Sequence, residues 1–133
     1  MPFATFVLRE GNIVDVQLQT SAGDDLLAAD LDEFLNGLAS ILSQQQTFAL
    51  LINCTGISTA PMRFAMRVVE FMKKHRAEFQ RLTRATAIVV ESQLVRNVLS
   101  FIFTIQPPAS PHKLVATHAE ALAHLQLSEA SIV

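Results

Sequence analysis

Short strand-like segments alternate with longer segments of helical period along this chain, and this alternation restricts the fold more than any other feature of the sequence. The clearest strand is Thr47–Asn53 (TFALLIN), an almost continuous apolar run that is typical of a strand covered on both faces. Between Asp24 and Gln45, apolar residues recur at three- and four-residue steps, which predicts an amphipathic helix. Because a strand covered on both faces needs helices on both sides of its sheet, the pattern predicts an α/β fold.

The same alternation continues toward both ends of the chain. Two N-terminal strands, Phe3–Arg9 and Asn12–Gln19, flank a turn at Glu10-Gly11-Asn12 and form a predicted hairpin. The later predicted elements are, in order, a helix that begins at Pro61 and includes Phe79, a strand Thr83–Glu91, a helix Gln93–Ile105 capped by Ser92, a strand Lys113–Thr117 and a helix Ala119–Leu127. The order ββαβαβαβα predicts a single domain over residues 1–133, an α/β sandwich with a mixed sheet.

Composition excludes several classes of protein. Half of the 133 residues are hydrophobic, which is enough for a core without a disulfide or a metal. The single cysteine, Cys54, excludes an intramolecular disulfide. The longest apolar runs have about five residues, far below the roughly 20 that a membrane-spanning helix needs. We therefore expect no transmembrane segment, and the lack of an export signal at the N-terminus predicts a cytoplasmic protein.

Three segments carry a resemblance to a known family. They are LLINCTGISTAP followed by a basic amphipathic helix, FMKKHRAEFQRLTRATAIVVE, and the ending KLVATHAEALAHL. Together with the order of elements, the first segment resembles STAS domains of the SpoIIAA-like group, the anti-sigma-factor antagonists. The chain is also similar to the branch of that group that is related to lipid-binding CRAL-TRIO domains. The resemblance implies a STAS-type sandwich and a regulatory protein that acts through protein–protein contacts.

In the regulatory members of that group, a partner kinase phosphorylates a serine at the start of the helix after the central strand. The corresponding stretch here is Ala60-Pro61-Met62, so the usual phosphoacceptor serine is absent. Ser58 and Thr59 lie a few residues earlier and could accept phosphate only if the alignment shifts. The resemblance therefore implies a STAS-like module without the usual phosphorylation switch.

Ligand sites in open α/β sheets form beyond the carboxyl ends of the strands. Residues there make the rim of a possible site: Asn53, Thr55, Ser58, Thr59 and Ser92, with Thr117 and His118 on the same rim. Helix N-termini near the rim point N–H groups toward it, and Arg63 adds positive charge, so the rim could hold an anionic group. The alternative interpretation is ordinary loop and helix-capping chemistry.

No pattern in the sequence indicates a catalytic or metal site. Cys54 follows an apolar strand, which favours a small buried thiol over a nucleophile paired with a histidine. The four histidines are spread over separate segments without the spacing of a zinc site. We therefore expect no catalytic residue, no cofactor and no metal, and an enzyme built around Cys54 is a minor alternative.

Basic residues are concentrated in the middle of the chain. Residues 61–96 carry eight basic and three acidic side chains, although the whole chain has a net charge of −2. Arg63, Arg67 and Lys74 lie on one face of the predicted helix and are candidate contacts for an acidic partner or anionic headgroups. A solvated helix face is the alternative. The near-neutral pI and the absence of Trp and Tyr argue against nucleic acid.

The helix Gln93–Ile105 is apolar over too much of its circumference for the surface of a small monomer. Its candidate contact residues are Leu94, Val98, Phe101 and Phe103. A surface helix buries one apolar stripe, so the surplus needs a second cover. A homodimer or another protein partner is the favoured cover, and a helix wedged in the core is the last choice. The second choice, after a protein partner, is an apolar ligand in a pocket lined by Val98, Phe101, Ile102 and Phe103.

The sequence therefore predicts a non-enzymatic interaction module that is homodimeric or binds a protein partner. The alternative prediction is a binding protein or sensor for a small apolar or lipid-like ligand.

Overall fold

The computed structural model describes residues 3–20, 28–57 and 60–130, and a five-stranded sheet lies at its centre. The strands are β1 (Ala4–Arg9), β2 (Ile13–Gln19), β3 (Phe48–Gly56), β4 (Thr83–Val89) and β5 (His112–Val115). They lie side by side in chain order, with β1 antiparallel to β2 and all the other neighbours parallel. The predicted α/β fold with a mixed sheet is confirmed.

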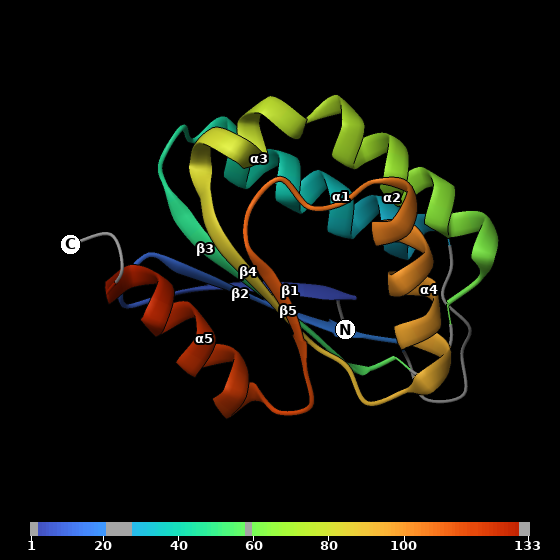
Figure 1. The fold of residues 1–133 in the computed structure, drawn as a ribbon. Coiled ribbons are helices and arrows are strands. Elements are labelled where there is room, and N and C mark those ends of the chain that lie inside the picture. Colours follow the sequence, from blue (N-terminus) through green and yellow to red (C-terminus); the bar gives the residue numbers. More distant parts are fainter. Residues whose placement is uncertain (1–2, 21–27, 58–59, 131–133) are drawn as a thin grey trace.

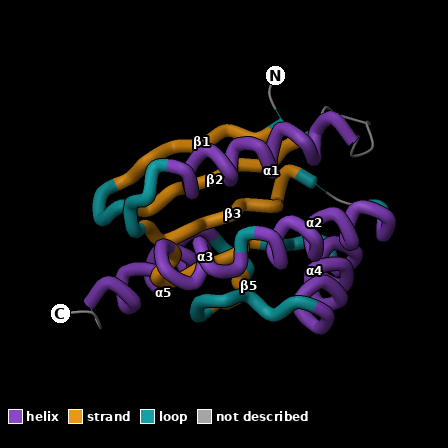
Figure 2. Tube along the Cα trace, turned by 90° about the horizontal axis from the view of Figure 1, so that it is seen from above, coloured by secondary structure: helices purple, strands orange, loops and turns teal. Residues whose placement is uncertain are grey.

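Helices cover both faces of the sheet. They are α1 (Ala28–Ser43), α2 (Met62–Lys74), α3 (Arg76–Leu82), α4 (Gln93–Ile105) and α5 (His118–Ala130). The crossovers from β2 to β5 all step in the same direction, and right-handed crossovers then place their helices on one face. Figure 1 shows α1 to α4 on that face and α5, which follows the last strand, alone on the other. From above, α1 lies over the β1–β2 end of the sheet (Figure 2).

The helix predicted from Pro61 is two helices in the structure, which adds one helix to the predicted order. Pro61 itself is extended, with ψ 136°, and precedes the first helical residue. The break lies at His75, whose backbone leaves the helical region at φ −106°. The His75 ring nitrogen Nδ1 lies 2.7 Å from Oε1 of Glu78, and this contact closes the first turn of α3. The chain changes direction here without losing backbone hydrogen bonds, because the His75 carbonyl accepts from the N–H of Phe79.

Strand β3 is longer than predicted, because it continues past Asn53 to Gly56. Glycine permits this extension: a Cβ atom at position 56 would lie 2.4 Å from the carbonyl oxygen of Leu18 on β2. Cys54 and Thr55, which were expected to follow the strand, are therefore part of it.

The β1–β2 hairpin has the predicted turn. Gly11 and Asn12 have positive φ angles of 78° and 56°, a backbone that tight hairpin turns require and that these residue types tolerate. The other predicted boundaries agree with the structure within a few residues. Asp24, where the predicted helix after the hairpin begins, lies outside the described residues.

The sheet separates two hydrophobic cores. The core under α1 to α4 contains mostly large side chains, among them Phe34, Phe48, Leu50, Phe64, Leu82 and Ile88. The core under α5 contains many small ones and consists of Ile13, Ala49, Leu51, Ala85, Ala87, Val89, Val115, Ala121 and Leu125. Among the described residues, no helix has the length and apolar character needed to cross a membrane.

Candidate functional site

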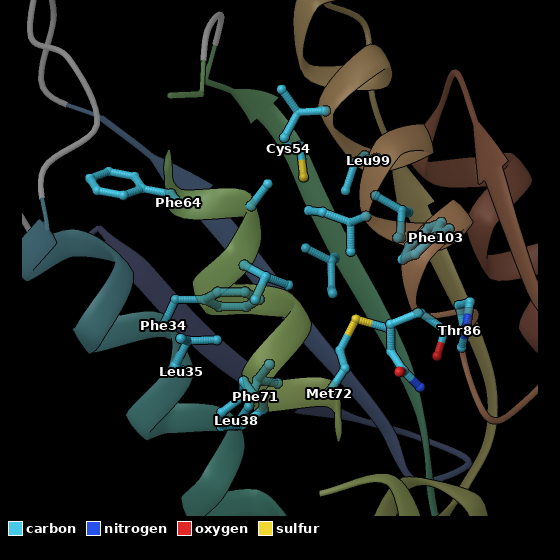
Figure 3. A pocket seen from close by; sticks show the side chains of 18 of the residues that line it. Phe34, Leu35, Leu38, Cys54, Phe64, Phe71, Met72, Thr86, Leu99 and Phe103 are labelled. Atoms are coloured by element: carbon cyan, nitrogen blue, oxygen red, sulfur yellow. The ribbon is translucent and has the colours of Figure 1, made fainter. Parts of the chain in front are cut away.

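A cavity of about 180 Å³ lies between the sheet and the layer formed by α1, α2 and α4. Apolar side chains line most of it: Leu35 and Leu38 from α1, Phe71 and Met72 from α2, Leu99, Ile102 and Phe103 from α4, and Leu50 and Ile88 from the sheet. Figure 3 shows Cys54 and Thr86 at opposite ends of this space. Dry apolar cavities of about 150 Å³ take up molecules the size of benzene, so this cavity has room for a small apolar ligand.

The position of α4 explains why the space is not filled. This helix packs mainly against α2, and Ala65, Val69 and Ile102 form a small core between the two. Because the two helices close on each other rather than on the strands, their side chains do not interdigitate with the sheet over its whole area. The cavity thus arises from helix–helix packing.

The apolar surplus predicted for α4 is present and is divided between two environments. Val98 and Phe103 line the cavity, as the ligand-pocket alternative predicted. Leu94 and Phe101 are 59% and 39% exposed and are not part of the lining. The prediction that Phe101 lines the pocket is therefore wrong, because this residue lies on the outer side of the helix. Ile105, also exposed, continues the same outer stripe.

The basic residues predicted as contacts on α2 do not form a single site. Arg67 makes an ion pair with Asp32 of α1. The Arg63 guanidinium carbon lies 4.8 Å from the centroid of the Phe64 ring. Lys74 borders a shallow groove between α1 and α2, together with Arg67. The charge of Arg67 is thus already balanced by an acid of the same chain.

The described residues of the predicted rim make hydrogen bonds within the chain. The Ser92 hydroxyl oxygen accepts a hydrogen bond of 3.3 Å from the N–H of Val95 and caps α4, as predicted. The side-chain oxygen of Asn53 accepts a hydrogen bond of 3.0 Å from the N–H of Thr55. Ser58 and Thr59 lie outside the described residues. The Ser92 contact corresponds to the capping interpretation of the rim.

A buried polar cluster lies on the α5 face of the sheet. Asp15 of β2 is fully buried and accepts hydrogen bonds from Arg9 Nε at 2.5 Å and from Gln17 Nε2 at 2.7 Å. Its Oδ2 also lies 2.9 Å from Nε2 of His118, the first residue of α5. Asn53 donates to Gln17 at 2.9 Å and brings in β3. The cluster therefore joins β1, β2, β3 and the start of α5.

The state of Asp15 shows what this cluster does. Burial raises the pKa of the carboxyl, but the hydrogen bonds from His118, Arg9 and Gln17 outweigh it, and the pKa lies below its ordinary value. Asp15 is thus an ionised acceptor that holds the start of α5 on the sheet. The sequence pattern missed the cluster because Asp15 occupies a polar position of an alternating strand. The one available signal was an acid and a base on the same hairpin.

Cys54 is buried and lines the cavity, as expected for a small buried thiol. Burial raises the pKa of the Cys54 thiol to about 12. The thiol is therefore protonated near neutral pH and is not an activated nucleophile. Within the part of the chain that the structure describes, no group of three or more histidine, cysteine or acidic residues could hold a metal ion.

Comparison with models of known protein families finds no family that matches this chain, and comparison with curated proteins also finds no match. The cavity, the exposed stripe of α4 and the polar cluster remain as the features from which a function follows.

Proposed function

We propose that this domain is a non-enzymatic cytoplasmic binding protein for a small apolar or amphipathic ligand that occupies the cavity beneath α2 and α4. The cavity of about 180 Å³ with its apolar lining carries the proposal. The lining side chains lack packing partners on the side that faces this space. A ligand with a single ring or a short acyl chain supplies those partners.

The element order supports a related proposal, that the domain is STAS-like. The structure has two N-terminal antiparallel strands followed by alternating helices and parallel strands, which is the arrangement that the resemblance implies. The similarity to lipid-binding relatives of that group agrees with an apolar cavity in the core. The two proposals are independent, because the cavity would bind its ligand whatever the ancestry of the fold.

A second candidate function is a protein–protein contact through the exposed stripe of α4. Leu94, Phe101 and Ile105 are 59%, 39% and 41% exposed and follow one another along one side of the helix. Arg96 is the single charged residue of α4, and its guanidinium donates to a carbonyl oxygen of Val90 at 3.5 Å. An uncharged apolar stripe can pair with a copy of itself without like-charge repulsion, which supports a homodimer.

Titration with 1-octanol, followed by NMR of methyl groups, tests the ligand-binding function. We expect shifts at Leu99 and Ile102, and we expect Leu99→Phe, which narrows the cavity, to weaken binding at least about tenfold, equivalent to 1.4 kcal/mol. The matched control is Leu94→Phe on the exposed side of the same helix, which leaves binding unchanged. Octanol binding that is equal in both variants would show that the cavity is not the site.

Sedimentation tests the second candidate. The chain should sediment as a dimer, and the double variant Leu94→Ser/Phe101→Ser should sediment as a monomer with unchanged octanol binding. A monomeric parent protein at high concentration rules out the homodimer and leaves the ligand-binding function intact.

A further inference from the structure

We infer that the ligand of this cavity is an anionic amphiphile, whose apolar chain fills the cavity and whose carboxylate headgroup is bound by Arg76. This inference rests on the proposed ligand-binding function and adds the chemical class of the ligand. Among the described residues that line the cavity, Arg76 is the one charged side chain, and none is acidic. A single unopposed positive charge beside an apolar space matches a ligand with one negative group and an apolar tail.

The polar lining residues gather at one end of the cavity. They are Arg76 at the start of α3, Thr86 on β4, Gln106 after α4, and Ser110 in the loop before β5. The N–H of Thr86 donates to the carbonyl oxygen of Pro111 at 2.9 Å, which holds that loop beside β4. Met72, one turn before Arg76, also lines the cavity. Hydroxyl, amide and guanidinium groups are therefore available together to a headgroup.

The opposite end of the cavity is apolar, and its distance from the polar end is that of a short acyl chain. In the register of the sheet, Thr86 is beside Leu50, and Cys54 is four residues further along β3. Four residues of extended strand span about 13 Å. Ile52 and Ile88 line the cavity between these points. The lining thus extends at least this far along the strands, with polar residues at one end and apolar residues at the other, which suits a short acyl chain with a headgroup.

Arg76 is free to bind such a headgroup. Its side chain is exposed and has no ion pair or hydrogen bond within the described part of the chain. The acid closest in sequence, Glu78, is instead bonded to His75 at 2.7 Å. The carboxyl ends of α2 and α4 bring partial negative charge near this region, about half a unit each. The N–H groups of His75 and Gln106 already donate to carbonyl oxygens in the last turns of these helices. The full positive charge of Arg76 therefore outweighs these partial negative charges.

Three ligands with the same chain length distinguish the contribution of the headgroup to the binding affinity from that of the apolar cavity. The full chain is titrated with octanoate, 1-octanol and octylammonium, and dissociation constants are measured by NMR. We expect octanoate to bind about tenfold more tightly than octanol, because a charged hydrogen bond adds this much affinity. Octylammonium should bind more weakly than octanol, since its charge repels the guanidinium.

The variant Arg76→Gln should remove the preference for octanoate and leave octanol binding as it is in the parent protein. Arg81→Gln is the matched control: this exposed arginine lies on the same helix and does not line the cavity, so octanoate should keep its preference. Because both arginines are exposed, we expect both variants to unfold at the temperature of the parent protein.

The outcomes separate the two claims. Equal affinity for octanoate and octanol, or an octanoate preference that survives Arg76→Gln, overturns the headgroup site while octanol binding keeps the cavity function intact. Failure of all three ligands to bind overturns the cavity function and the headgroup site together.

Discussion

The two faces of the sheet are built from side chains of different size, and they differ in what they can do. Under α5, Ala85 and Ala87 of β4 meet Ala121 of α5, and all three are fully buried. Small side chains let a helix approach a sheet closely, so this interface is tightly closed. Under α2 and α4, large side chains such as Phe71 and Ile88 hold the layers apart and a cavity of about 180 Å³ remains.

The sheet thus separates a closely packed face from a face that borders unfilled space. The α5 face adds a buried ionic cluster around Asp15 to its close packing, and both features fix α5 in one position. The other face keeps unfilled apolar volume, which costs stability but leaves room for a ligand. The same substitution should therefore change the stability of the protein by different amounts on the two faces.

Two neighbouring leucines of β3 give the largest expected effect. Leu51 faces α5 and Leu50 faces the cavity, and both are buried. We expect Leu51→Ala to cost about 4 kcal/mol and Leu50→Ala about 2 kcal/mol, since Leu50 already borders unfilled space and loses fewer packing contacts. Urea denaturation of both variants measures the difference. Equal costs, or a larger cost for Leu50→Ala, would mean that the two faces are packed equally well.

Two neighbouring residues of β4 test overpacking in the same way. Ala87 is fully buried against α5, whereas Thr86 borders the cavity. Ala87→Leu should destabilise the protein by about 3 kcal/mol, because the added atoms have no space beside α5. Thr86→Leu should change stability by less than about 1 kcal/mol, because its added atoms enter the cavity. Thermal unfolding compares the two, and a severe loss with Thr86→Leu would contradict an open space at that position.

The polar cluster gives a smaller effect that depends on pH. The Asp15 carboxyl is fully buried, but its partners Arg9 and His118 are 46% and 34% exposed, so part of the interaction is screened by water. We expect Asp15→Asn to cost about 2 kcal/mol at pH 7, below the cost of breaking a fully buried pair.

The sign of the pH dependence follows from the pKa of Asp15, which lies below the ordinary value of 3.8 in the folded protein. A lowered pKa stabilises the fold above the unfolded-state value, and this stability is lost as the pH falls through the folded-state value. The gap between the parent protein and Asp15→Asn should therefore be full at pH 7 and shrink below pH 4, approximately the unfolded-state pKa. A gap of the same size at pH 7 and pH 3 in urea denaturation would show that the charge of Asp15 plays no part.

Local signals predicted much of the fold. The turn at Gly11-Asn12 needs residues that tolerate positive φ, and Ser92 is a good helix cap, so both were visible in the sequence. The break at His75 was not visible, because the helical pattern continues across it. The extension of β3 to Gly56 also escaped the pattern, since it depends on how closely β2 approaches.

The candidate site could be predicted only in part. The excess of apolar residues on α4 pointed to Val98 and Phe103 as residues with an additional role, and both line the cavity. In the sequence, Arg76 is one of several basic residues on a predicted helix, and nothing distinguishes it from Arg81. Asp15 stood as a polar residue on an alternating strand, where exposure is the usual expectation.

Apart from the break at His75, the spacing of neighbouring residues was enough to predict the alternation of strands and helices. The same spacing predicted their amphipathic faces and the surplus of apolar residues in α4. The tertiary structure alone decided that α4 packs on α2 and leaves a cavity over the sheet. It also decided that Arg76 borders that cavity and that α5 buries Asp15 beside His118. These outcomes join residues far apart in the chain, and no local pattern contains the distances between them.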